Sequence, residues 1–226
     1  MEAIILAGGL GTRLAHIVND SPKSMALVCG EPFLNYVLGN LRKYDFNHIV
    51  LAVGHMKEQI MEYVGSEYHG IEITYSIEES LLGTGGGIKQ ALSFCNDSNV
   101  FVLNGDSFLE VDFLEMLNSH LKKSADITIA TKRMVNFDRY GTININKDSM
   151  RVLSFNEKKY QEKGVVNGGV YIMKKNLLDN IKEIKFSVER DVFENKNLNL
   201  KMYAFETDGY FIDIGVPEDY YKAQKD

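Results

Sequence analysis

The chain has 226 residues, of which 45% are hydrophobic and 25% are charged, and its formal net charge is -6. This composition is typical of a soluble globular protein, and the length suits one α/β domain or one domain with a small inserted lobe. The chain is acidic and has no dense run of Lys and Arg, which excludes a general nucleic-acid binder. No apolar stretch is long enough for a membrane span or a signal peptide. We therefore expect a cytoplasmic protein with no nucleic-acid and no membrane partner.

The first half of the chain alternates apolar runs of strand length with helical patterns. Strands that are buried on both faces are predicted at 3–7, 48–54, 72–78 and 100–106. Helices are predicted between them at 33–44, at 57–64, from the second glycine cluster to about residue 94, and after a cap at Asp112, with leucines at 114, 117 and 121. This order indicates a Rossmann-like, mostly parallel sheet with helices on both faces.

The second half is richer in strand-like segments and has fewer helices. We predict strands at 126–134, 142–146, 151–158, 165–173, 200–205 and 210–215. A short helix is expected from Ser187, and a last one from Pro217, because proline suits the first helical turn. We interpret this half as an extension of the sheet plus a small lobe over its open end, so that residues 1–226 form one domain.

Glycines gather in two loops at the predicted carboxyl edge of the sheet. Gly8, Gly9 and Gly11 follow the first strand, and a second cluster at 83–87 follows the third. Such loops let backbone N–H groups approach a ligand's oxygen atoms. The first loop ends neither as a Walker A loop nor as a dinucleotide fingerprint, since Leu14 takes the last glycine position. It adds cations instead: Arg13, and Lys23 behind a proline, are suited to clamp a triphosphate.

Two aspartates lie at the carboxyl ends of apolar strands. Asp106 ends the segment LNGD, and Asp213 lies in FIDIG. Carboxylates from such distant positions could converge on Mg²⁺, which prefers oxygen ligands. The two cysteines, Cys29 and Cys95, have neither the spacing of a zinc site nor that of a disulfide framework, and we expect buried, reduced thiols.

The ordered series GGLGTRL, PK, LGTGG, LNGD, YGT, NEK, NGGVY and FIDIGVPEDY covers essentially the whole chain and resembles the sugar-1-phosphate nucleotidyltransferases. Within that family, FDRYGT and FIDIGVPEDYY are most similar to the D-glycero-α-D-manno-heptose 1-phosphate guanylyltransferases. The resemblance implies a nucleotide-binding half at 1–106 and a sugar-phosphate-binding half at 107–226. The chain departs from the common family pattern at Ser24, where many relatives have proline, and at Ser80, where many have an acid.

The resemblance also implies the site residues. Nucleotide binding falls to Leu6, Ala7, Gly8, Gly9, Gly11, Thr12, Arg13, Glu78, Gly83 and Thr84. Sugar-phosphate binding falls to Tyr140, Gly141, Glu157, Lys158 and Asn167. The catalytic groups are Arg13, Lys23, Asp106 and Lys158, and Asp106 and Asp213 hold Mg²⁺.

Glu78 aligns where many relatives have a base-reading glutamine. A carboxylate can accept hydrogen bonds from both the ring N–H and the amine of guanine, whereas uracil and thymine suit an amide. The sequence therefore favours GTP, although a one-residue slip would give this role to Glu79.

The expected reaction transfers a nucleoside monophosphate, GMP from GTP, to a sugar 1-phosphate, with release of pyrophosphate. The nucleophile is a phosphate oxygen whose second pKa lies at about 6, so no general base is required at neutral pH. The enzyme must bring two anions together and stabilise in-line attack at the α-phosphorus.

Several alternatives remain open at this point. The same chemistry could use mannose 1-phosphate or an N-acetylhexosamine 1-phosphate with UTP or CTP. A dinucleotide-dependent oxidoreductase would lack its fingerprint glycine, and a non-catalytic nucleotide-sugar sensor would have no need to retain Lys23 and Asp106. The sequence also leaves open whether the protein is a homodimer.

Overall fold

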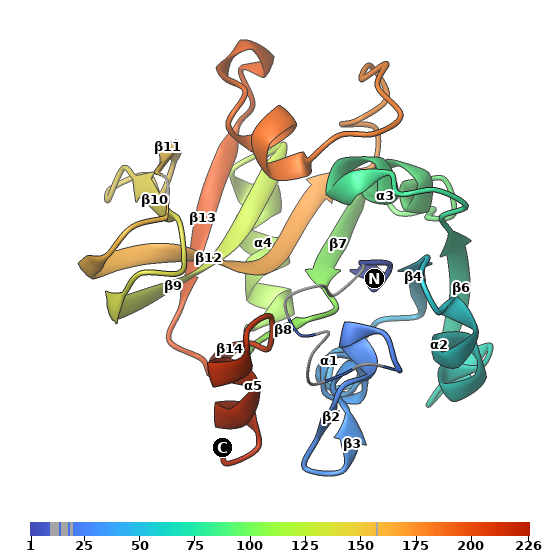
Figure 1. Ribbon diagram of the computed structural model, residues 1–226. Coiled ribbons are helices and arrows are strands. Elements are labelled where there is room, and N and C mark those ends of the chain that lie inside the picture. Colours follow the sequence, from blue (N-terminus) through green and yellow to red (C-terminus); the bar gives the residue numbers. More distant parts are fainter. Residues whose placement is uncertain (10–13, 15–17, 19, 157) are drawn as a thin grey trace.

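The computed structural model of the protein describes residues 1–9, 14, 18, 20–156 and 158–226. Within this part of the chain, ten strands form one sheet (Figure 1). Its centre is parallel, in the order β7 (Asn99–Asn104), β1 (Glu2–Leu6), β4 (His48–Val53) and β6 (Ile71–Ile77). The short β5 (Glu67–Tyr68) pairs antiparallel with β6 at the edge. The four predicted strands and their parallel arrangement are thus confirmed, but β6 is only partly buried, unlike β1, β4 and β7.

The second half of the chain joins this centre in the antiparallel sense. The long strand β12 (Gln161–Lys174) pairs with β7 and also with β9 (Ile127–Phe137), beside which β13 (Met202–Thr207) lies parallel. The hairpin of β10 (Thr142–Ile145) and β11 (Val152–Asn156) joins β12 through β10. This hairpin stands at the far edge of the sheet, at the left of Figure 1.

Both faces of the central strands are covered. On β1, Ala3 and Ile5 belong to one hydrophobic core, whereas Ile4 belongs to the other. Helices α1 (Phe33–Leu41), α2 (Lys57–Val64) and α4 (Phe113–Lys122) contribute to the first core, and α3 (Gly83–Leu92) contributes to the second. A fully buried aliphatic side chain contributes about 1.5–3 kcal/mol, so strands covered on both faces retain continuous apolar runs.

Short elements complete the carboxyl edge of the sheet and its surroundings. They are η1 (Lys23–Met25), the hairpin β2 (Leu27–Val28) and β3 (Glu31–Pro32), β8 (Ser107–Leu109), η2 (Glu189–Phe193), η3 (Lys196–Leu198), β14 (Phe211–Asp213) and α5 (Pro217–Ala223). The pairing of β14 with β8 matters most for function, because it places Asp213 opposite Ser107. The last strand of the chain therefore returns to the end of β7.

The predicted starts of α4 and α5 are confirmed. The Asp112 carboxylate caps α4 by accepting a hydrogen bond of 2.9 Å from the Glu115 N–H, and α5 begins at Pro217. η2 begins two residues after Ser187, whose hydroxyl accepts from the Arg190 N–H.

The expectation of two buried thiols is wrong for one of them. Cys95 is buried, but Cys29 is exposed, because it lies with positive φ in the turn between β2 and β3.

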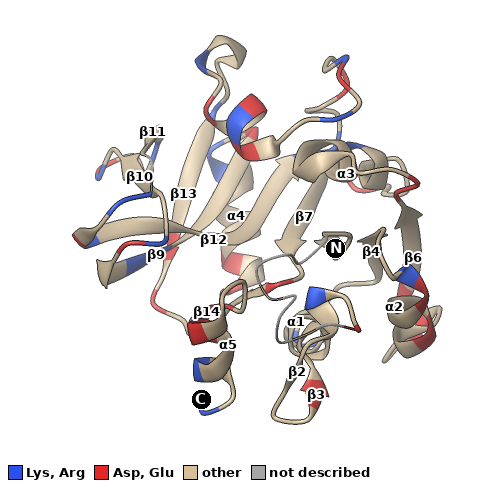
Figure 2. Ribbon diagram, viewed as in Figure 1, with Lys and Arg blue, Asp and Glu red and all other residues tan. Residues whose placement is uncertain are grey.

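Acidic and basic residues are interspersed along the described ribbon (Figure 2). No helix among the described residues has the length and apolarity needed to cross a lipid bilayer.

Candidate active site

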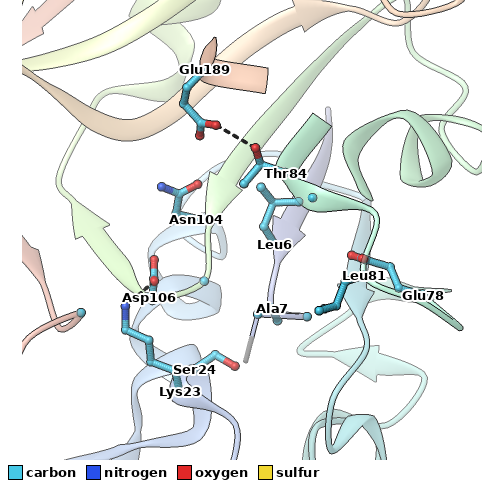
Figure 3. Close-up of a pocket in the computed structure, with 15 residues that line it drawn as sticks. Leu6, Ala7, Lys23, Ser24, Glu78, Leu81, Thr84, Asn104, Asp106 and Glu189 are labelled. Carbon is cyan, nitrogen blue, oxygen red and sulfur yellow. Dashed lines mark hydrogen bonds and ion pairs between the residues drawn. The ribbon is translucent and has the colours of Figure 1, made fainter. Parts of the chain in front are cut away.

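A pocket of about 350 Å³ opens at the carboxyl edge of the parallel strands. Its walls come from the ends of β1, β6 and β7 and from the start of α3, as Figure 3 shows. Every described member of the predicted nucleotide set lines it: Leu6, Ala7, Gly8, Gly9, Glu78, Gly83 and Thr84. Lys23 and Asp106 complete the side nearest the end of β7.

A second pocket of about 590 Å³ adjoins the first and lies against the β10–β11 hairpin and β12. The described members of the predicted sugar-phosphate set line it, namely Tyr140, Gly141, Lys158 and Asn167, together with Asp213. Asn104 and Glu189 line both pockets. The described members of the two predicted sets thus line two neighbouring pockets that share a wall.

Lys23 lies where the two predicted metal ligands meet. Its ammonium donates a short hydrogen bond to Asp106 Oδ2 and lies 3.8 Å from Asp213 Oδ1. The backbone holds this arrangement, because the Ile214 N–H donates to the Asp106 carbonyl at 3.0 Å and the Gly215 N–H donates to Asp213 Oδ1 at 2.7 Å.

The carboxylates of Asp106 and Asp213 fit a divalent cation. Both reach one ammonium, so both can reach one small cation, and they offer the hard oxygen ligands that Mg²⁺ prefers. Among the described residues no group of three or more His, Cys, Asp or Glu side chains is arranged as a metal site. Two protein carboxylates suit Mg²⁺, which usually completes its shell with water and substrate phosphates.

Glu78 and Glu79 have opposite surroundings. The Glu78 carboxylate lines the first pocket and accepts a hydrogen bond of 3.2 Å from the Leu82 N–H. A methyl group on Gly8 or Gly87 would lie 3.1 or 2.7 Å from its Oε1, so glycine makes room for this side chain. Burial raises the pKa of Glu78, although the Leu82 N–H acts in the opposite direction. Glu79 is 87% exposed and faces Lys57 at 3.7 Å, outside the pocket.

The loop that carries Tyr140 is tied to the C-terminal helix. Arg139 donates hydrogen bonds to Glu218 at 2.7 Å and to Asp219 at 2.9 Å, and the Tyr140 hydroxyl lies 3.4 Å from Asp219. The Tyr140 ring also packs edge-on against Phe211 of β14. Burial raises the pKa of Tyr140, and the charges of Asp213 and Asp219 raise it further, so the hydroxyl keeps its proton at neutral pH.

Asn167 and Lys158 face the second pocket in different ways. The Asn167 amide is held in place, since its nitrogen donates to the Tyr171 hydroxyl at 2.7 Å and its oxygen accepts from the Gly169 N–H at 2.9 Å. Lys158 is exposed but lines the pocket. Its neighbour Lys159 is also exposed but does not line the pocket.

The family model described as nucleotidyl transferase matches residues 2–226. The chain belongs to this family. It is 47% identical to the D-glycero-alpha-D-manno-heptose 1-phosphate guanylyltransferase of Aneurinibacillus thermoaerophilus, over 100% of this chain and 98% of that protein. Identity to the enzyme of the same name from Campylobacter jejuni is 45%, over 98% and 97%. HddC from Yersinia pseudotuberculosis, in a crystal structure complexed with GMP-PN, superposes with a TM-score of 0.89 at 36% identity, covering 99% of this chain and 98% of that one.

In this nucleotidyl transferase, Glu189 lines both pockets and is not among the residues predicted from the sequence. Its Oε2 accepts hydrogen bonds from the Thr84 and Ser187 hydroxyls, each at 2.7 Å, which hold the carboxylate at the boundary of the two pockets (Figure 3). No local pattern marked it, because an acid in a first helical turn is ordinary. The predicted helix start at Ser187 was the nearest available signal.

Four predicted site residues of this nucleotidyl transferase, Gly11, Thr12, Arg13 and Glu157, lie outside the described residues. Their roles stay predictions.

Proposed function

We propose that this nucleotidyl transferase moves GMP from GTP to D-glycero-α-D-manno-heptose 1-phosphate and releases pyrophosphate. Full-length identity of 47% and 45% to two enzymes of that name supports the substrate pair. One structural observation carries the reaction type: Asp106 lines one pocket, Asp213 lines the adjoining one, and both face the same ammonium.

In this proposal the triphosphate lies in the first pocket, under the glycines that follow β1. Lys23 neutralises its phosphates, with Arg13 as the second cation predicted from the sequence. Cations at this position stabilise the charge that builds up on the leaving pyrophosphate.

The sugar 1-phosphate lies in the second pocket. Lys158 at the rim binds its phosphate, and Asn167 and the backbone at Gly141 contact the sugar. The nucleophilic oxygen is already deprotonated at neutral pH, so the chain supplies orientation rather than a base.

Asp106 and Asp213 would hold Mg²⁺, which when bound supplies charge neutralisation between the two phosphates. The two halves proposed for the chain, 1–106 and 107–226, then correspond broadly to the two pockets. The division is not strict, because Glu189 and Gly215 of the second half also line the first pocket.

Guanine recognition falls to Glu78. Its position in the first pocket supports it over Glu79, which points to solvent. A carboxylate accepts from both the ring N–H and the exocyclic amine of guanine.

The test is pyrophosphate release with Mg²⁺ and each of GTP, CTP, UTP, ATP and dTTP, against heptose, mannose and N-acetylhexosamine 1-phosphates. We expect release with GTP and the heptose phosphate. Asp106→Ala, which controls for contaminating enzymes, should lower turnover at least ~100-fold, the scale of losing one oriented electrostatic group. Release with another pair only would discard the substrate assignment. Tight nucleotide binding without release by any pair would favour a sensor.

A further inference from the structure

We propose that the Lys23 ammonium occupies the cation position between Asp106 and Asp213 in the substrate-free protein, and that a divalent metal enters only when the nucleotide draws this ammonium away. The inference rests on the proposed function for the identity of the two carboxylates as metal ligands. It adds a second role for Lys23, as the group that makes metal binding depend on nucleotide binding.

The three charges already form a cation site. The Lys23 side chain is only 10% exposed, and it contacts Asp106 directly while facing Asp213 Oδ1 at 3.8 Å. One ammonium therefore serves two carboxylates from distant parts of the chain, which would otherwise repel one another. Figure 3 shows Lys23 extended towards Asp106 at the edge of the first pocket.

The surrounding backbone is shaped for this ammonium. A Cβ on Gly215 would lie 2.6 Å from Lys23 Nζ and 2.6 Å from Asp213 Oδ1, so any larger residue would crowd the ion pair. Gly215 has no positive φ among the described backbone angles, so a larger residue here would act through space, by shifting the Lys23 ammonium or the Asp213 carboxylate.

The anchor of Lys23 is fixed while its long side chain can turn. The Met25 N–H donates to the Pro22 carbonyl at 2.8 Å and the Ala26 N–H donates to the Lys23 carbonyl at 3.1 Å, which holds the η1 backbone. Lys23 lines the nucleotide pocket from this position. A bound triphosphate would thus offer other anionic oxygens, which the Lys23 ammonium can reach by rotation of its side chain.

A divalent ion and the ammonium cannot share the same carboxylate oxygens, because two cations at such short range repel strongly. A metal that binds to the protein without nucleotide must therefore displace the Lys23 ammonium, with no triphosphate present to accept it. With a triphosphate present, the ammonium gains new partners as it leaves. By linkage, the nucleotide then favours the metal and the metal favours the nucleotide to the same extent.

The experiment measures Mn²⁺ binding to the purified protein without nucleotide, from the electron paramagnetic resonance signal of free Mn²⁺. We compare the parent protein, Lys23→Met, Lys57→Met and the double variant Lys23→Met/Asp106→Asn. Lys57 is the matched control, since it also faces a glutamate but lies away from the site. Circular dichroism confirms that each variant is folded.

Lys23→Met should bind Mn²⁺ at least ~10-fold more tightly than the parent protein, the effect of about 1.4 kcal/mol of removed repulsion. Lys57→Met should match the parent, and the double variant should lose the gain. Equal or weaker binding by Lys23→Met would overturn the proposal. So would an equal gain in Lys57→Met, or a gain that survives Asp106→Asn. Because no substrate is present, this binding result can fail while the proposed transfer reaction is still observed, so the two failures are distinguishable.

Discussion

At the residue scale, Glu78 shows how position decides the role of a carboxylate. It is enclosed by Gly8, Gly87 and the Leu82 N–H inside the first pocket, whereas the adjacent Glu79 is solvated. Enclosure raises the pKa of Glu78. The two adjacent glutamates therefore have different chemical environments in the folded protein.

We predict that the KM for GTP rises as the pH falls towards this raised pKa, which lies above the ordinary glutamate value of 4.5. A protonated carboxyl can no longer accept both guanine hydrogen bonds. Glu78→Gln should raise the KM for GTP at pH 8 by roughly 10- to 100-fold, the scale of one charge-assisted hydrogen bond. In this variant the KM for GTP should no longer rise as the pH falls. An unchanged pH profile in Glu78→Gln would contradict guanine recognition by this residue.

The same pKa shift has a consequence for stability. Because the folded state holds this proton more tightly than the unfolded chain, the free energy of unfolding decreases as the pH rises from 4.5 through the raised pKa. Glu78→Gln removes that cost, so urea unfolding at neutral pH should find the variant at least as stable as the parent.

Lys158 and Lys159 are adjacent lysines that serve as a matched pair for testing the second pocket. Only Lys158 lines it, and both are exposed. Lys158→Met should raise the KM for the sugar 1-phosphate roughly 10-fold while the KM for GTP stays unchanged. Lys159→Met should leave both constants at parental values. Steady-state kinetics with each substrate varied in turn checks this, and equal effects of the two variants would refute the assignment.

At the scale of elements, α5 positions the loop between β9 and β10. Asp219, which is 15% exposed, accepts hydrogen bonds from Arg139 and Tyr140 and so holds one wall of the second pocket. Glu218 binds the same arginine but is 79% exposed. Solvent therefore weakens the ion pair of Arg139 with Glu218 far more than that of Arg139 with Asp219.

Asp219→Asn should therefore raise the KM for the sugar 1-phosphate by roughly 3- to 10-fold, leaving the KM for GTP near its parental value. Glu218→Gln, the control on the same arginine, should have little effect. A parallel loss of both substrates' affinities in Asp219→Asn would indicate general destabilisation rather than positioning of the loop.

A second element-scale link joins three segments at the amino edge of the sheet. Glu2 of β1 is buried, contacts His48 of β4 at 2.8 Å and accepts hydrogen bonds from the N–H groups of Asn96 and Asp97 before β7. Burial alone would raise its pKa, but these hydrogen bonds outweigh burial and lower it.

Glu2→Gln should lower the free energy of unfolding by about 1–3 kcal/mol, since one amide oxygen cannot replace a charged pair of acceptors. The lowered pKa means that this contribution is present above pH 4.5 and disappears as the pH falls through the folded-state value. Urea titrations at several pH values measure the difference between parent and variant. A difference that grows on acidification would contradict this role.

At the scale of the whole molecule, the sequence could predict the parallel centre of the sheet and several members of each pocket. Continuous apolar runs such as that of β4 mark strands buried on both faces. The motif series located Asp106 and Asp213, although only the pairing of β14 with β8 shows how they meet.

Other features depend on long-range packing that no local pattern encodes. Glu189 reaches the boundary of the pockets because η2 packs near Thr84 of α3. On α4 the buried residues are Phe113, Met116 and His120, while Leu114 and Leu121 are exposed, so packing against the rest of the molecule decides which face of this helix is buried. Cys29 is exposed because a turn places it there.

We expect the first pocket to hold the guanine nucleotide and the second to hold the sugar 1-phosphate. The most direct measurement is a crystal structure of the protein with Mg²⁺, heptose 1-phosphate and a GTP analogue whose bridge between the α- and β-phosphorus atoms cannot be cleaved. We predict guanine against Glu78 and Gly8, and the sugar phosphate between Lys158 and Tyr140 with its oxygen facing the α-phosphorus. Nucleotide in the second pocket, or a sugar phosphate bound away from Asp213, would contradict this assignment of the two pockets.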